Sequence, residues 1–408
     1  MTTSSAARRA AVVLDIDGVI HRGGIAIPGS AAAVQRLFDA GIPFCFLTNG
    51  GGTTESAKAV SLSTLLENVP IQACQVVLAH TPFRHLVAQY AESRVLVIGG
   101  SASISAMRGY GFHRAVAVLE LQSDFPELVP FKEFEGQWAE RAEQSRRLHS
   151  TWPVQQLRAA IQEAITFAAV FFLDSVGVDG LNDVQVAVDA LTRVHPSPSA
   201  APEAQLQAVP FFMQADDDFW AASQAVGPRL GESLFRKLLE IAFHSSTGNA
   251  LRVVQFGKPR KVAFDEAALA LQAAVDNVAA FSSRRGGDAQ PLYYMVGDNC
   301  HVDILGANAL GTSWRSILVD TGVGLPVHPS KFRHAPVHID QVQRHSGIQP
   351  HVASSTDDFA ERIRLHALAT PGSEATNDTA AGFRPWKSFD NLETFVSALL
   401  TGQLDNEQ

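Results

Sequence analysis

Two aspartates, Asp15 and Asp17, stand at the end of an apolar run and could act together on a phosphate ester. Side chains alternate between the two faces of a strand, so both carboxylates share one face if they lie in it. One carboxylate can attack phosphorus, and the other can give a proton to the leaving oxygen and later take one from water. The same pair is common at ordinary strand ends and turns, so alone it is weak evidence for a catalytic site.

Two further clusters could bind phosphate. Thr48-Asn49-Gly50 follows the next apolar run, and a hydroxyl with exposed backbone N–H groups can hold phosphate oxygens. Lys258, between Gly257 and Pro259, could neutralise charge on a transferring phosphoryl group. The alternatives are a glycine-rich turn for the first cluster and a solvated surface lysine for the second.

A fourth cluster could bind a metal ion. Asp298 and Asp303 follow an apolar run, with Asn299, Cys300 and His301 between them. Hard carboxylate oxygens suit Mg²⁺, which usually takes one or two protein carboxylates together with waters and a substrate phosphate. Asp303 could instead cap the following helix. No second Cys/His pair stands at zinc spacing, so Cys300 and His301 are expected to be bystanders.

The elements between these clusters predict how they are brought together. Each cluster follows a short apolar run with the composition of a strand, and helical patterns separate the runs. The runs are residues 10–16, 42–47, 253–256 and 292–296. In one parallel sheet, all four clusters would meet at the carboxyl edge, where open α/β sheets bind ligands. Together they supply what phosphoryl transfer requires.

The middle of the chain has a different residue pattern, which predicts a second α/β unit. Short strand-like runs occur at 94–98, 115–119, 168–174 and 209–214, with helical patterns between them. The charged stretch 130–150 is expected to be an exposed excursion.

Composition limits the kind of protein. The chain has 408 residues, of which 46% are hydrophobic, and this supports a large core over two or three domains. The net charge of −9 argues against nucleic-acid binding, which requires many cations. Three scattered cysteines predict neither a disulfide framework nor a zinc cluster.

The sequence also favours an intracellular, cytoplasmic location. No apolar run reaches the roughly 18 residues of a membrane span. Residues 1–9 contain two arginines and no acid, and they lack the apolar stretch of a secretory signal. A solvated tail is expected there, with a short mitochondrial presequence as the alternative.

As a set, the four clusters resemble the motifs of the haloacid dehalogenase superfamily of phosphohydrolases. The matching stretches are DIDGVI at 15–20, Thr48-Asn49, GKP at 257–259 and GDNCHVD at 297–303. The long gap between the second and third motifs resembles subfamily IIA, whose large cap is inserted there. The stretches at 48–52, 80–83 and 316–323 resemble the branch named for the cat eye syndrome critical region protein 5.

The resemblance implies catalytic and metal-binding roles. Asp15 would form an aspartyl-phosphate and would also bind Mg²⁺. Asp17 would be the general acid and then the base, and its backbone carbonyl would be a metal ligand. Asp298 would bind the metal, with Asp303 and Asn299 in support.

The resemblance also implies phosphate and substrate contacts. Thr48, the Asn49 and Gly50 amides and Lys258 would hold the phosphate, and Lys258 would steady the nucleophile. In the cap, the segment 214–220 resembles one that contacts substrate, and its candidates are Asp217 and Trp220.

Three positions depart from the family pattern. Gly50 stands where many members have a second Asn, and Cys300 replaces a common Pro. The cap segment lacks the Asn usually found near Ala215. These departures leave the substrate open among sugar phosphates, glycerol phosphate, phosphoglycolate and nucleotides.

The expected fold is α/β, with a Rossmann-like core whose parallel sheet is flanked by helices and a large inserted α/β cap of the C2 type. Residues 1–78 and 256–323 would form the core and 79–255 the cap. Residues 324–408 would be an extension partly packed on the core, with helices near 358–366 and 392–400. Five tail histidines are expected to be solvated: His328, His334, His338, His345 and His351.

The expected function is a magnesium-dependent phosphatase acting on a small-molecule phosphate monoester. A homodimer through the cap is a further expectation. The alternative is a binding or regulatory protein of the same fold with little turnover. The complete set Asp15, Asp17, Lys258 and Asp298 favours the enzyme, although fold alone does not establish activity.

Overall fold

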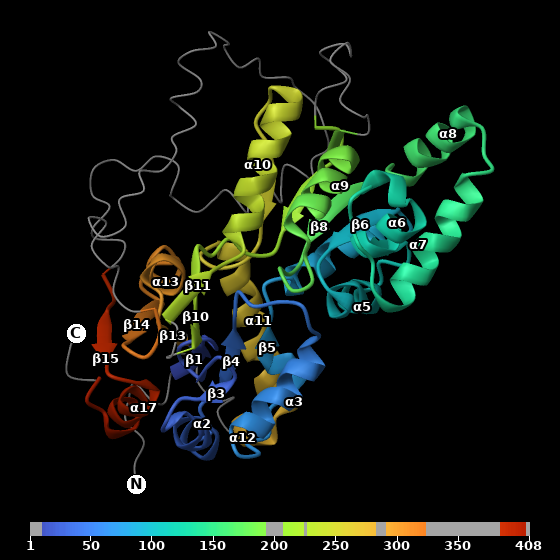
Figure 1. Cartoon of the computed structure of the whole chain (residues 1–408). Helices are drawn as coiled ribbons and strands as arrows, with labels where there is room; N and C mark the ends of the chain where they lie inside the picture. Colours follow the sequence, from blue (N-terminus) through green and yellow to red (C-terminus); the bar gives the residue numbers. More distant parts are fainter. Residues whose placement is uncertain (1–9, 193–206, 224–226, 283–290, 324–383, 405–408) are drawn as a thin grey trace.

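The computed structural model describes residues 10–192, 207–223, 227–282, 291–323 and 384–404. Two parallel sheets with helices on both faces make up this part of the chain (Figure 1). The first sheet is assembled from segments near both ends of the chain, and the second from the middle. We call them the core sheet and the cap sheet. The expected α/β fold with a parallel sheet flanked by helices is confirmed.

The core sheet has six parallel strands in the order β15-β14-β13-β1-β4-β5. Their bounds are β1 Ala10–Leu14, β4 Phe44–Leu47, β5 Val76–Val77, β13 Leu292–Gly297, β14 Trp314–Val319 and β15 Lys387–Phe389. β1 is buried along its whole length, as an apolar run in a parallel sheet should be. It lies between β13 and β4, so the residues that follow these three strands are neighbours.

Helices cover both faces of the core sheet. Val12 and Leu14 pack in one hydrophobic cluster with α2, α3 and α17, while Ala11 and Val13 pack with α11 and α13 on the other side. The bounds are α2 Ser30–Asp39, α3 Glu55–Leu65, α11 Lys261–Asn277, α12 Ala279–Ser282, α13 Leu305–Asn308 and α17 Leu392–Thr401. The Thr54 side chain caps α3 by accepting a hydrogen bond from the backbone N–H of Ala57.

The cap sheet has five parallel strands in the order β12-β9-β8-β6-β7. Their bounds are β6 Val95–Ile98, β7 Ala115–Ala117, β8 Ala169–Phe172, β9 Phe211–Met213 and β12 Val253–Gln255. Aromatic side chains fill its two faces: Phe172 stacks on Phe235, and Phe171 lies against Phe83, Phe112 and Phe212.

The cap helices lie on either side of this sheet (Figure 1). They are α4 Val87–Tyr90, α5 Ser101–Tyr110, α6 Val118–Asp124, α7 Gly136–His149, α8 Val154–Ala164, α9 Gly180–Thr192 and α10 Ser233–Thr247. An antiparallel hairpin of β10 Phe219–Ser223 and β11 Gly227–Leu230 extends from the cap towards a small core hairpin, β2 His21–Arg22 and β3 Ile25–Ala26. The cap therefore contacts the core close to Asp17.

One expectation about the strands is wrong. The run at 253–256 was expected in the same sheet as the other three runs, but residues 253–255 form β12, which pairs with β9 in the cap sheet. The expected cap, 79–255, does include these residues. The charged stretch 130–150 is mostly exposed, as expected, and residues 136–149 within it form α7, a polar helix that buries few side chains and so lacks a clear apolar stripe.

The C-terminal segment returns to the core. β15 pairs with β14, and α17 packs against α2 beside Phe389. The helix expected near 392–400 is present as α17. The helix expected near 358–366, the five tail histidines and residues 1–9 lie outside the described residues. Among the described helices, none is both long and apolar enough to cross a bilayer. Cys45, Cys74 and Cys300 are free.

Candidate active site

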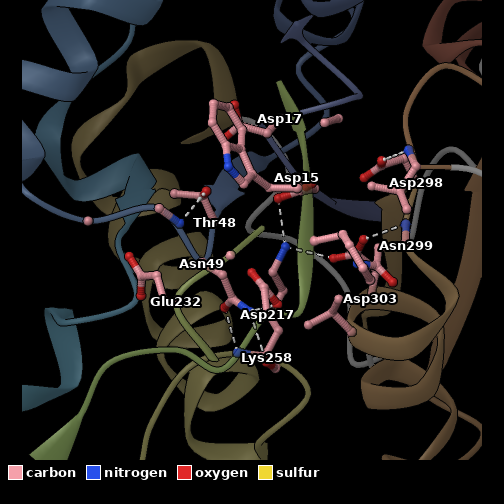
Figure 2. Close-up of a pocket in the computed structure, with 18 of the residues that line it drawn as sticks. Asp15, Asp17, Thr48, Asn49, Asp217, Glu232, Lys258, Asp298, Asn299 and Asp303 are labelled. Carbon is pink, nitrogen blue, oxygen red and sulfur yellow. Dashed lines mark hydrogen bonds and ion pairs between the residues drawn. The ribbon is translucent and has the colours of Figure 1, made fainter. Parts of the chain in front are cut away.

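A cavity of about 260 Å³ opens where the carboxyl edge of the core sheet faces the cap (Figure 2). Asp15, Thr48 and Asp298 enter it directly after β1, β4 and β13, which are neighbouring strands. Every predicted site residue lines it: Asp15, Asp17, Thr48, Asn49, Gly50, Asp217, Trp220, Lys258, Asp298, Asn299 and Asp303. The structure thus brings the four sequence clusters together, although Lys258 arrives after a cap strand.

Lys258 is held between two buried carboxylates. Its Nζ lies 2.6 Å from Asp15 Oδ1 and 2.6 Å from Asp303 Oδ1, as the dashed lines in Figure 2 mark. Burial pulls the pKa of Lys258 down, but the charges of Asp15 and Asp303 outweigh it, so the pKa ends above its ordinary value. The ammonium is therefore charged. Burial raises the pKa of Asp15 above its ordinary value, and the charge and hydrogen bond of Lys258 oppose that rise.

The loop after β13 holds Asp303 inside a turn and leaves the Asp298 side chain lining the cavity. The Asn299 side chain caps a single π-type turn, Cys300–Ile304, by accepting from the His301 N–H. Asp303 Oδ2 accepts a hydrogen bond from the N–H of Asn299, the N-cap residue, at 3.1 Å, so Asp303 also satisfies a backbone donor at the start of the turn, as the capping alternative expected. Cys300 and His301 do not line the cavity.

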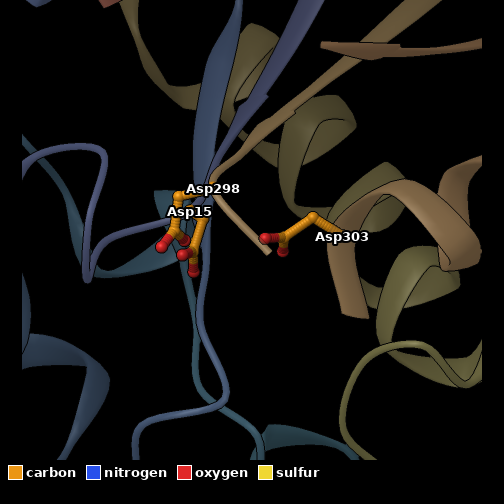
Figure 3. A group of neighbouring side chains, drawn as sticks. All are labelled: Asp15, Asp298 and Asp303. Atoms are coloured by element: carbon orange, nitrogen blue, oxygen red, sulfur yellow. The ribbon is translucent and has the colours of Figure 1, made fainter. Parts of the chain in front are cut away.

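Three carboxylates could hold a metal ion. Single oxygens of Asp15, Asp298 and Asp303 lie within 4.8 Å of one another, and all three side chains are buried (Figure 3). Burial, and next the charges of Asp15 and Asp303, raise the pKa of Asp298 well above its ordinary value. Three buried carboxylates face the one ammonium of Lys258. A divalent cation with a preference for hard oxygens fits this set and its excess negative charge.

Glycines let the backbone close around Asp298. A Cβ on Gly18 or on Gly322 would overlap the Asp298 carboxylate, and Gly18 has a φ of 90° that other residues rarely adopt. The Val323 N–H donates to Asp298 Oδ2. Asp298 is thereby fixed from both sides at the end of β13.

Asp17 lies at the open side of this group. Its side chain is 25% exposed, and burial raises its pKa despite opposing effects of Lys58 and Lys258. Burial also lowers the pKa of the nearby His21 to about 4, so this histidine is neutral at pH 7 and does not hold Asp17 ionised. Asp17 can therefore carry a proton closer to neutral pH than an ordinary aspartate does.

Thr48 and Asn49, which follow β4, make two different sets of hydrogen bonds. Thr48 Oγ1 accepts a hydrogen bond from the Gly50 N–H at 2.9 Å, which orders the turn. The Asn49 side chain accepts from the Lys258 N–H at 2.7 Å and donates to the Lys258 carbonyl and to Asp217 Oδ1, both at 2.9 Å. Asn49 thus positions the backbone of Lys258, a role that the sequence did not indicate.

The cap contributes the opposite wall of the cavity. Asp217 and Trp220 were predicted there, and Asp174 and Glu232 were missed. Burial raises the pKa of Asp217 to about 7, with Asn49 and Lys258 opposing it and Asp303 and Asp15 adding to it. Asp174 follows β8 and Glu232 precedes α10, and neither stands in a pattern that separates it from a surface acid.

Family models match both parts of the core. One described as haloacid dehalogenase-like hydrolase matches residues 12–113, and a second described as HAD-hydrolase-like matches residues 255–343. The first covers the segment that carries Asp15, Asp17 and Thr48, and the second covers Lys258, Asp298 and Asp303.

Two curated proteins are similar to this chain. "Mitochondrial hydrolase YKR070W" of Saccharomyces cerevisiae is 28% identical over 337 residues, which are 78% of this chain and 88% of that protein. A "cardiolipin synthase (CMP-forming) / mitochondrial hydrolase fusion protein" of Schizosaccharomyces pombe is 30% identical over 313 residues. Those residues are 76% of this chain but 47% of the fusion protein, so the chain spans about half of it.

Solved structures share the fold. A 4-nitrophenylphosphatase from Thermotoga maritima aligns with a TM-score of 0.52 at 15% identity, over 96% of this chain and 97% of that one. A p-nitrophenyl phosphatase from Archaeoglobus fulgidus aligns with a TM-score of 0.52 at 17% identity, over 96% and 98%. At these identities the likeness concerns the fold. The branch named for the cat eye syndrome critical region protein 5 is not tested by these relatives and stays a prediction.

Proposed function

The chain belongs to the haloacid dehalogenase-like hydrolases, and from that premise we propose that it is a magnesium-dependent phosphatase acting on a small-molecule phosphate monoester. The observation that carries the proposal is the buried contact of Lys258 Nζ with Asp15 Oδ1 at 2.6 Å. It places a fixed cation on a buried carboxylate that lines a cavity, and the same cavity also holds an acid, a hydroxyl and a metal-binding group.

Asp15 is the proposed nucleophile. Its Oδ1 is engaged by Lys258, which leaves Oδ2 to attack phosphorus and form an aspartyl-phosphate as the ester oxygen departs. Lys258 stays beside the developing charge on the phosphoryl oxygens, where a fixed cation stabilises the transition state. The Thr48 hydroxyl and the Asn49 amide are proposed to take the remaining oxygens, and the Gly50 amide would join them by leaving Thr48 Oγ1, to which it donates in this structure.

Asp17 is the proposed general acid and base. Its raised pKa favours the protonated form, which can give its proton to the leaving oxygen. The carboxylate so formed can take a proton from the water that attacks the aspartyl-phosphate. Both steps then balance, because the proton lost in the first is regained in the second.

Mg²⁺ is proposed to be held by the carboxylates of Asp15 and Asp298 and by the backbone carbonyl of Asp17, with Asp303 and Asn299 in support. When bound, it would offset the excess negative charge of these acids and allow a phosphate dianion to approach. Metal-free protein should therefore bind phosphate esters poorly.

A phosphate-release screen tests this function. Wild type is assayed on p-nitrophenyl phosphate and a panel of metabolite monoesters, with Mg²⁺ or with EDTA, beside Asp15→Asn and Asp39→Asn. Asp39 is an acid outside the cavity that bonds Gln35, so its variant controls for the loss of one carboxylate. We expect release only with Mg²⁺, and its loss in Asp15→Asn alone. Equal release by wild type and Asp15→Asn would refute the mechanism, and no release at all would support the binding or regulatory alternative.

The location is a separate proposal. Both curated relatives are named as mitochondrial hydrolases, which favours the mitochondrial alternative over the cytoplasm for this chain. The full chain with a C-terminal fluorescent tag should co-localise with a mitochondrial marker. A diffuse cytoplasmic signal would contradict it.

A further inference from the structure

The cap side of the cavity is acidic. Asp174, Asp217 and Glu232 all line it, and we call these three residues the cap wall. In the view of Figure 2, Glu232 lies on the other side of Asp15 from Asp298. Among the described residues that line the cavity, Lys258 is the one Lys or Arg, and Asp15 and Asp303 already bind it. The cap wall therefore faces the cavity without a positive charge of its own.

The partners of these acids are neutral. Glu232 accepts from Gln214 Nε2 at 2.8 and 2.9 Å, Asp174 from the Val176 N–H, and Asp217 from Asn49. No ion pair joins any of the three to another described residue.

The acids on either side of Asp217 give a direct contrast. Asp216 pairs with Arg236 at 2.6 Å, and Asp218 pairs with Lys237 at 2.5 Å. Both of these cations lie on α10, within reach of the same loop. The chain thus compensates the acids that face α10 and leaves uncompensated the one that faces the cavity.

The three acids are half-buried, and shielding carboxylates from water without a cation beside them is unfavourable. Burial and then the charges of Asp174, Asp217 and Asp216 raise the pKa of Glu232 well above its ordinary value, with Gln214 opposing this. Gln214 is itself fully buried, and its Oε1 has no hydrogen-bond partner among the described residues. That oxygen lies behind Gly51 and not in the lining, so the carboxylates of the cap wall are the charged acceptors that this side presents to the cavity.

Trp220 completes the wall. It lines the same cavity, and 40% of its surface is exposed. An exposed indole face attracts cations, and carboxylates beside it strengthen the attraction. The wall also lies next to the proposed phosphate site, because Asp217 accepts a hydrogen bond from the Asn49 side chain at 2.9 Å. A group bound at the cap wall would be a short distance from a phosphate held by Thr48 and Lys258.

On the basis of the proposed phosphatase function, we propose that the substrate is a phosphate monoester whose alcohol part carries a cationic amine, bound at the cap wall. An ammonium group supplies the donors and the charge that Asp174, Asp217 and Glu232 lack. A carboxylate or a second phosphate in its place would add negative charge beside the wall and would raise the already raised pKa values of Asp217 and Glu232 further. A neutral hydroxyl would satisfy acceptors but leave their charge uncompensated, so it should bind with intermediate strength.

Three esters that differ in one terminal group test this proposal. They are 2-aminoethyl phosphate, 2-hydroxyethyl phosphate and phosphoglycolate, assayed with Mg²⁺ at pH 7 beside p-nitrophenyl phosphate. We expect kcat/KM to fall about tenfold from the amine to the hydroxyl, and about tenfold again to the carboxylate, as for hydrogen bonds to charged groups. Similar values for all three, or a preference for the carboxylate, would overturn the proposal.

Glu232→Gln tests the assignment to the wall. The amide keeps an acceptor for Gln214 and removes the charge, so the ratio of kcat/KM for amine over hydroxyl should fall at least about fivefold. The matched control is Glu240→Gln on α10, which lies outside the cavity and bonds Arg236; its ratio should stay within about twofold of wild type. An unchanged ratio in Glu232→Gln would overturn the assignment. Absence of phosphate release from all four esters would instead contradict the proposed function.

Discussion

Lys258 connects Asp15, the proposed nucleophile, to the rest of the cavity lining. Its ammonium bonds Asp15 and Asp303, and its backbone is bonded on both sides by the Asn49 side chain. One residue therefore depends on three separate segments of the chain. Its geometry is fixed before substrate arrives, which is how a charged group contributes most to a transition state.

Replacing Lys258 should destabilise the protein as well as inactivate it. In Lys258→Met the carboxylates of Asp15 and Asp303 lose their common cation while staying buried. The free energy of unfolding in EDTA at pH 7 should fall by about 3 kcal/mol, as for other broken buried ion pairs. Urea unfolding followed by tryptophan fluorescence measures it. Lys237→Met is the control, because its partner Asp218 is exposed; equal losses in the two variants would contradict this account.

Asp217 should make stability depend on pH. Its pKa of about 7 lies above the ordinary 3.8, so the folded state retains a proton that the unfolded state loses. Ionisation therefore destabilises the fold progressively between about pH 4 and pH 7. Asp217→Asn keeps an acceptor for Asn49, and its Tm relative to wild type should rise across this window and level off above it. A constant or shrinking difference, measured in EDTA, would contradict the assignment.

The sequence predicted the strand-end residues that line the cavity better than the contacts that position them. Asp15, Thr48 and Asp298 could be found because each follows an apolar strand. Asn49 as the holder of Lys258, and Glu232 in the cavity wall, could not be found. Their roles depend on how the cap lies over the core, and neither residue stands in a local pattern that reports this.

At the scale of elements, the loop after β4 is where the cap meets the core. A Cβ on Gly51 would overlap Gln214 Oε1 and the Leu173 carbonyl, both of which belong to the cap. The glycine at this position is therefore needed for close approach of the cap, and its φ is not left-handed. A side chain here would push the cap wall away from the phosphate site.

Gly51→Ala should raise KM and lower Tm, because the added methyl group displaces the cap. The matched control is Gly109→Ala in α5, where nothing lies within 4 Å of the added Cβ. Gly109→Ala should raise the free energy of unfolding by about 0.5–1 kcal/mol, because it lowers the conformational entropy of the unfolded chain. Differential scanning fluorimetry and steady-state kinetics compare the two. Equal Tm and KM for Gly51→Ala and wild type would show that the contact is not tight.

The strand order shows why the positions of some elements could not be predicted from the sequence. β1 and β13 are long apolar runs, and their parallel pairing followed from their pattern. β12 has three half-buried residues, so nothing in its sequence distinguishes the cap sheet from the core sheet. The helix α7 could not be predicted for a similar reason: it buries too few side chains for apolar residues to recur at helical spacing.

At the scale of the molecule, the core is closed by segments from both ends of the chain. α17 packs against α2, and Phe395 contacts Tyr294 of β13. The C-terminal segment thus supports the strand that carries Asp298. The residue pattern near 392–400 predicted the helix, whereas the edge strand β15 has three residues and is too short to show a strand pattern.

Leu399→Ala should therefore destabilise the whole core. Leu399 is fully buried in the cluster beneath the core sheet, and its truncation should cost about 2–5 kcal/mol. Leu269→Ala is the control, because Leu269 is 60% exposed, and it should cost less than about 0.5 kcal/mol. Urea unfolding compares them, and similar losses would mean that α17 does not support the core.

The central claim is that Asp15 forms an aspartyl-phosphate, and the most direct test uses Asp17→Asn with p-nitrophenyl phosphate and Mg²⁺. Nitrophenolate leaves without a general acid, so the first step should proceed while hydrolysis, which needs Asp17 as base, is slowed. Mass spectrometry of the quenched enzyme should then find one phosphoryl group, on the peptide that contains Asp15. A phosphoryl group elsewhere, or steady release of phosphate by Asp15→Asn, would contradict the account.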